Sequence, residues 1–129
     1  MRVLALDYGV ARTGVAVSDA TGTLARPLTV VRRAGTVPGL RELADIVRRE
    51  QAELVVVGLP LSLDSREHDQ ARAVRSFVAR LSRALPVPVV TYDERFTTKL
   101  AAGRGGAAAL DARAAAVLLE DYLKAAESS

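Results

Sequence analysis

The sequence predicts an α/β fold in which helices cover both faces of a mixed five-stranded sheet. Two observations predict it. Three apolar stretches follow one another at the start of the chain, joined by short turns, which is typical of antiparallel strands. Helical patterns then alternate with apolar strands, which is typical of parallel crossover units. The length of 129 residues fits one domain, so residues 1–129 are predicted to form a single unit.

Each predicted strand is a short apolar stretch bounded by turn residues. The five ranges are 2–7, 13–18, 23–32, 53–58 and 87–92. The fourth, ELVVVG, is a continuous apolar run, as expected for a strand buried on both faces. Pro27 cannot donate a ladder hydrogen bond, so the third strand is predicted to be an edge strand or to contain a bulge. The first, fourth and fifth strands are predicted to be parallel, and the second to lie antiparallel between the first and third.

The predicted helices are identified by apolar residues at helical spacing. In residues 39–50, one face collects Leu40, Leu43, Ile46 and Val47. Residues 66–84 and 111–126 form the other two long helices, and residues 97–102 form a short helical piece.

Composition excludes several kinds of chemistry. The chain has no Cys and one His, so disulfides, thiolate nucleophiles and Cys-based zinc sites are excluded. No apolar run is long enough to cross a bilayer, and the first residues do not resemble a secretory signal, so a cytoplasmic protein without membrane contact is expected. The 18 basic residues are mostly Arg and exceed the 15 acidic ones, which suits a polyanionic partner or a solubilised surface.

Acidic residues stand where predicted elements end. They are Asp7, Asp64, the pair Asp93–Glu94, and Asp111. Ligands of sheets with parallel strands gather at the carboxyl ends of those strands. Asp7 ends the first strand and Glu94 comes just after the fifth, so both are placed at such an edge.

Asp111 begins the apolar stripe of the last helix, followed at i+4, i+7 and i+8 by Ala115, Leu118 and Leu119. A buried carboxylate is costly unless a positive group meets it, and a divalent cation would do so. The alternative, that Asp111 is an N-cap residue, is equally compatible with the spacing. A cluster of three carboxylates around Mg²⁺ or Mn²⁺, held as two ions, would suit phosphodiester hydrolysis.

Four segments together resemble the YqgF family, also called RuvX. They are VLALDYGVARTGVAVSD, VVVGLPLSLD, YDERFTT and LDARAAAVLLEDYL, which occur in the family order over nearly the whole chain. The resemblance implies a ribonuclease H-like fold and a nuclease that processes the 5′ end of pre-16S ribosomal RNA, with DNA junction resolution as an older proposal. It also implies that the acidic triad is Asp7, Glu94 and Asp111, which would be the catalytic residues and the metal ligands.

Two departures from the family pattern concern the substrate. The family usually has Asn-Met-Asp-Gly where this chain has Ser62–Ser65, and the segment between Thr98 and Asp111 is short and contains only two basic residues. The expected partner is RNA, structured or single-stranded, with branched DNA as the alternative; the protein is expected to be a monomer or a weak homodimer. Rival interpretations are an actin-like or sugar-kinase ATPase, disfavoured by size, and a nucleic-acid-binding module without turnover.

Two arginines are candidate phosphate contacts at the rim of the site. Arg12 lies in the first hairpin and Arg95 follows Glu94; the alternative for each is an ion pair, such as Arg95 with Asp93. Because neighbouring side chains of a strand point to opposite faces, Asp93 and Glu94 cannot both join one cluster. The resemblance implies that Glu94 is the metal ligand, and Asp93 is then expected to have a structural role.

Overall fold

The computed structural model describes residues 1–59, 65–93 and 107–127, and the side chains of all these except 65–70 and 107–110. In chain order the elements are β1 (Val3–Asp7), β2 (Arg12–Ser18), β3 (Ala25–Arg32), α1 (Val37–Glu50), β4 (Leu54–Leu59), α2 (Ser65–Ala84), β5 (Val89–Asp93) and α3 (Ala107–Glu127).

The five strands form one mixed sheet in the order β3-β2-β1-β4-β5. The strand β1 lies at the centre, antiparallel to β2 and parallel to β4, and β5 is parallel to β4. The predicted arrangement of the strands is therefore confirmed. The strand β3 lies at the edge, and its register with β2 shifts between Val15 and Ala16, where Ala16 pairs with Pro27. Pro27 therefore occupies the edge strand and the irregularity that its missing N–H requires.

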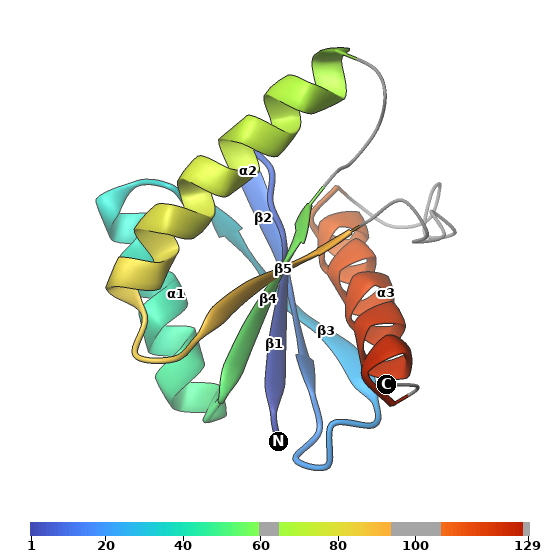
Figure 1. Cartoon of the computed structure of the whole chain (residues 1–129). Coiled ribbons are helices and arrows are strands. Elements are labelled where there is room, and N and C mark those ends of the chain that lie inside the picture. Colours follow the sequence, from blue (N-terminus) through green and yellow to red (C-terminus); the bar gives the residue numbers. More distant parts are fainter. Residues whose placement is uncertain (60–64, 94–106, 128–129) are drawn as a thin grey trace.

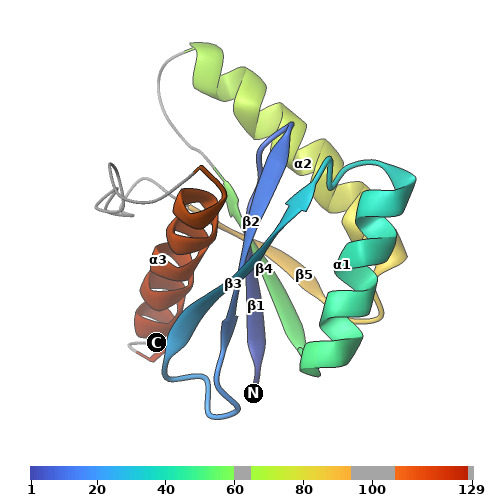
Figure 2. The same ribbon diagram turned by 180° about the vertical axis from the view of Figure 1, so that it is seen from behind.

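Two apolar cores lie on the two faces of the sheet. Figure 1 shows α1 and α2 on one side and α3 on the other, and the reverse view in Figure 2 agrees. The larger core packs alternate residues of the central strands against α1 and α2. The smaller core packs Val3, Ala5, Ala16 and Val56 against α3. Asp7 continues the alternation of Val3 and Ala5, so its side chain belongs to the α3 face.

Local signals determine where α1 begins and ends. The hydroxyl of Thr36 accepts a hydrogen bond from the N–H of Gly39 at 3.3 Å, and Pro38 lies in the first turn, where its missing N–H costs nothing. Gln51 ends the helix in the left-handed conformation, with φ of 56°. The predicted apolar face is confirmed, since Leu43, Ile46 and Val47 are buried.

The helix α3 begins at Ala107, four residues before the predicted start at Asp111. The interpretation of Asp111 as an N-cap residue is therefore wrong, because a full helical turn precedes it. The alanines of 107–109 have the highest helix propensity of any residue, which explains this extension. The predicted helical piece at 97–102 lies outside the described residues. No helix within the described ranges is long and apolar enough to span a membrane.

Candidate active site

Asp7 lies at the carboxyl end of β1 and is partly buried. In the antiparallel register of β1 and β2, Asp7 stands directly opposite Gly14. Residues that face each other in this way point to the same side of the sheet, so Asp7 and the Cα of Gly14 both face α3.

Gly14 brings α3 close to the sheet at Asp111. A Cβ atom built on Gly14 would overlap the carbonyl group of Asp111, so only a glycine allows this approach. Asp7 is opposite Gly14 in the sheet and Asp111 lies above Gly14 in the helix. The structure therefore places the two predicted carboxylate residues at the same edge and on the same face, from elements at opposite ends of the chain.

Asp111 forms an ion pair with Arg12. The guanidinium Nε lies 3.0 Å from Oδ2 of Asp111, and the two side chains are 42% and 29% exposed. Oδ2 itself is buried, and the contact does not have the geometry of a hydrogen bond, so this oxygen has no hydrogen-bond partner among the described residues. Of the two alternatives predicted for Arg12, a phosphate contact or an ion pair, the structure shows the ion pair, and its partner is Asp111.

The β1–β2 turn positions Arg12. A Cβ on Gly9 would lie 2.5 Å from the carbonyl oxygen of Arg12, so the turn closes tightly on itself. The hydroxyl of Thr13 donates to the carbonyl of Gly9 at 3.4 Å. The ring of Tyr8 stacks on Phe77 of α2, with centroids 4.3 Å apart. The turn is thus tied to the helix layer on the other face, which stabilises the position of Arg12 beside Asp111.

Glu94, Arg95 and Asp64 lie outside the described residues, so their roles stay predictions. The described part of β5 does show which of its faces belongs to the site. Tyr92 packs with the α3 core and makes an edge-to-face contact with Tyr122, with centroids 5.6 Å apart. Val89 packs with the opposite core, and Asp93 shares its parity. The face of Tyr92 is therefore the face of Asp7, and Asp93 belongs to the other.

Burial raises the pKa of the Tyr92 hydroxyl above its ordinary value of 10.0, and the charges of Asp121 and Asp93 add to the shift. The phenol therefore stays protonated at neutral pH, which excludes it as a general base there. Asp121 also has a buried Oδ2 without a hydrogen-bond partner in the described part of the chain. A buried unbonded carboxylate oxygen is thus not by itself a mark of the site.

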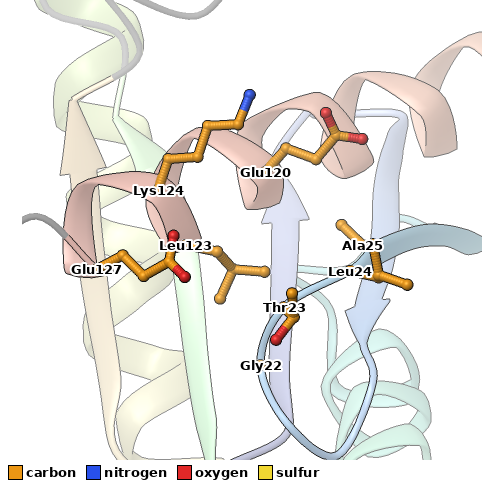
Figure 3. Close-up of a pocket in the computed structure, with 8 residues that line it drawn as sticks. All are labelled: Gly22, Thr23, Leu24, Ala25, Glu120, Leu123, Lys124 and Glu127. Atoms are coloured by element: carbon orange, nitrogen blue, oxygen red, sulfur yellow. The ribbon is translucent and has the colours of Figure 1, made fainter.

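A pocket of about 280 Å³ lies elsewhere, between the β2–β3 turn and the last turns of α3. In Figure 3 its lining includes Leu24, Leu123, Glu120 and Glu127. These residues lie near the start of β1, where the N-terminal amino group donates to the carbonyl of Ala20. The pocket is therefore at the end of the sheet opposite to Asp7 and is not a part of the candidate site.

The architecture is a ribonuclease H-like fold of the RuvC type. A solved structure of Thermus thermophilus RuvC in complex with a Holliday junction substrate superposes with a TM-score of 0.63, over 98% of this chain and 96% of that chain, at 20% sequence identity. The chain belongs to the RuvX family, since the family model described as "RuvX: Holliday junction resolvase" matches residues 1–125.

Two relatives have the name "Putative pre-16S rRNA nuclease". The one from Syntrophus aciditrophicus is 40% identical over 134 residues, which cover 97% of this chain and 89% of the relative. The one from Anaplasma marginale is 47% identical over 100 residues, covering 78% of this chain and 64% of the relative. The family resemblance inferred from the sequence is therefore confirmed.

Proposed function

We propose that this protein is a metal-dependent nuclease that hydrolyses phosphodiester bonds at the 5′ end of pre-16S rRNA. The observation on which the proposal depends is that Asp7 pairs with Gly14 in the sheet while the backbone of Asp111 packs on Gly14, which puts both acids on one face and at one edge of the sheet. Membership of the RuvX family and the names of the relatives support the substrate.

The two acids fit a divalent metal site. Both supply hard carboxylate oxygens, which Mg²⁺ and Mn²⁺ prefer, and Oδ2 of Asp111 is buried without a hydrogen bond. No group of three metal-binding side chains occurs within the described residues, and Glu94, the third proposed ligand, lies outside them. When bound, one or two ions would activate water and stabilise the charge of the phosphate.

Side chains of this protein would bind the ions and contact the phosphate of the substrate. Asp7, Glu94 and Asp111 would hold the ions, and Arg12 balances the charge of Asp111 in the protein without metal. Arg12 remains 42% exposed, so its free N–H groups can reach an anion in solvent, and a guanidinium suits a phosphate. Arg95 is proposed as a second contact of this kind.

A cleavage assay with purified protein tests the function. The substrates are an RNA with the 16S precursor 5′ extension, the same sequence as single-stranded DNA, and a four-way DNA junction, each with Mg²⁺, Mn²⁺ or EDTA. Metal-dependent shortening of the RNA supports the proposal, and cleavage of the junction alone supports DNA resolution instead. Tight binding without cleavage under every metal condition would indicate a binding module without turnover.

Glu94→Gln and Asp93→Asn should separate the two neighbouring acids. Glu94 has the parity of Tyr92, whose face Asp7 shares, whereas Asp93 has the parity of Val89 on the other face. We expect Glu94→Gln to lose cleavage by more than about 100-fold without unfolding, since changes next to metal ligands already cost about 10- to 100-fold. Asp93→Asn should lower stability and keep partial activity. Metal-dependent cleavage and circular dichroism of both variants check this; an active Glu94→Gln beside a folded, inactive Asp93→Asn reverses the assignment.

Arg12→Gln should weaken substrate binding more than it weakens the fold. The ion pair with Asp111 is partly exposed and partly screened by solvent, so its loss should lower the free energy of unfolding by only about 1 kcal/mol. Loss of a phosphate contact should lower the affinity for RNA of any sequence. It should also reduce the slope of the logarithm of the binding constant against the logarithm of the salt concentration by about one. The measurement is RNA binding between about 50 and 200 mM salt. Unchanged RNA affinity at about 50 mM salt would show that Arg12 pairs with Asp111 and does not contact the phosphates.

A further inference from the structure

The register of β2 and β3 places a second arginine beside the candidate site. Arg12 pairs directly with Arg32, two residues beyond the pair of Gly14 with Val30. Side chains of directly opposed residues share a face, and alternate residues of one strand return to it. Arg12 and Arg32 therefore lie on the α3 face, the face of Asp7, at the edge next to the carboxylates.

The charge of Arg32 is not balanced inside the described part of the protein. Like charges directly opposite each other destabilise a sheet, so two facing arginines are unfavourable without an anion. Arg12 is paired with Asp111, whereas Arg32 is exposed and, among the described residues, forms no ion pair. Asp111 therefore pairs with Arg12 alone, and the guanidinium group of Arg32 faces solvent at this edge of the site.

The backbone around Arg32 is held firmly in place. The next residue, Arg33, has a left-handed backbone with φ of 46°, a rare conformation for a residue with a Cβ. Its N–H donates to the carbonyl of Ala11 at 3.0 Å, and its carbonyl accepts from the N–H of Thr36, also at 3.0 Å. Arg33 also contacts α1 so closely that a Cβ on Gly39 would overlap its carbonyl oxygen. Arg32 is thus presented from a fixed strand end, which lowers the entropy lost when it binds a ligand.

We infer that Arg12 and Arg32 together form a phosphate-binding pair for the backbone of a nucleic acid. The inference rests on the proposed function for its ligand class. Arg32 lies two residues beyond the level of Gly14, about 7 Å along the strand direction at about 3.3 Å per residue, and one strand, about 5 Å, across the sheet. Phosphates recur about every 3.4 Å along the axis of each strand of a duplex. Arg32 would therefore contact a phosphate one or two nucleotides away from the bond held at Asp7 and Asp111.

Binding measured without cleavage tests the pair. Every variant is made in an Asp7→Asn background and studied in EDTA, with a fluorescently labelled RNA hairpin and a labelled four-way DNA junction as probes. The readout is fluorescence anisotropy between about 50 and 200 mM salt. Arg32→Gln should weaken binding by about 3- to 10-fold and reduce the salt slope by about one ion. A loss on one probe only assigns the site to RNA or to DNA.

Arg26→Gln is the matched control. Arg26 lies on the same strand at its opposite end, is 60% exposed, and pairs with Glu50 at 3.5 Å. Arg26→Gln removes the same charge but at the other end of the strand, away from the candidate site. It should therefore change the affinity and the salt slope much less than Arg32→Gln does. Arg32→Lys should restore the salt slope and part of the affinity, because it keeps the charge and loses the guanidinium fork. Melting temperatures of the variants verify that each is folded.

Two results would overturn the inference: equal losses for Arg26→Gln and Arg32→Gln, or wild-type affinity and slope for Arg32→Gln. A failure of the nuclease proposal is a separate result. It would be seen as absence of cleavage by the unmodified protein, whereas this experiment measures binding by a variant that is not required to cleave.

Discussion

Asp7→Asn is expected to abolish metal-dependent cleavage, with a loss of more than about 100-fold in rate, while the protein stays folded. The amide keeps the shape of the side chain and removes the charge that would bind a cation. Asp7 and Asp111 lie at the same edge on the same face, so removing one charge also relieves repulsion between them. The free energy of unfolding should therefore stay similar or rise, as is common when an active-site charge is neutralised. Cleavage in Mn²⁺ and urea unfolding measure the two effects.

Asp45→Asn provides the control for the charge change. Asp45 is 67% exposed on α1 and forms a surface ion pair with Arg48, far from the α3 face. Its neutralisation should leave the cleavage rate within about twofold, since exposed pairs contribute little. Cleavage that persists in both EDTA and the Asp7→Asn variant would refute metal-dependent chemistry at this site.

Gly14→Ala is expected to destabilise the protein by about 3 kcal/mol and to inactivate it. The added methyl group would overlap the carbonyl of Asp111, which is backbone and cannot move as a side chain can. To make room, α3 would have to shift away from β2, against which it makes its most extensive contact. The shift moves Asp111 away from Asp7, so activity should fall even where the protein is still folded. Urea unfolding and cleavage at low temperature, under conditions that keep the variant folded, check both parts.

Gly35→Ala is the matched substitution at a position where the neighbouring group is a flexible side chain. A Cβ there would lie 3.1 Å and 3.5 Å from the terminal nitrogens of Arg80, whose long side chain can shift by a few tenths of an ångström while it still donates to the carbonyl of Gly35. Its free energy of unfolding should change by less than about 1 kcal/mol. Equal effects of the two substitutions would mean that the close approach of α3 at Gly14 is not what fixes the site.

Periodicity and element order were enough to predict the sheet. The strand directions and the place of β2 between β1 and β3 were predicted from three hairpin-connected strands and two crossover units, and Pro27 indicated the edge strand correctly. The start of α3 was predicted four residues late, because a run of alanines has helix propensity without an apolar pattern to mark its beginning.

The site was only partly predictable for a different reason. Asp7 stands at the end of a strand and Asp111 at the start of the apolar stripe of the last helix, but the approach of α3 to β2 at Asp111 depends on Gly14 having no side chain. The pairing of Arg12 with Arg32 depends on the exact β2–β3 register, and Pro27 indicated an edge strand or a bulge without giving that register. Contacts between elements that are distant in the chain depend on such registers, and the residue pattern of a single element does not determine them.

The contact of α3 with the first strands has a consequence for synthesis. Asp7 belongs to β1 and Asp111 to α3, so Asp7 is synthesised well before Asp111. At about 5–20 residues per second, roughly 5–20 s separate the synthesis of the two residues. During that interval the first three strands have no α3 to cover them, and the carboxylate pair does not exist. With the proposed function, cleavage would therefore begin only after α3 has been made and has folded onto the sheet.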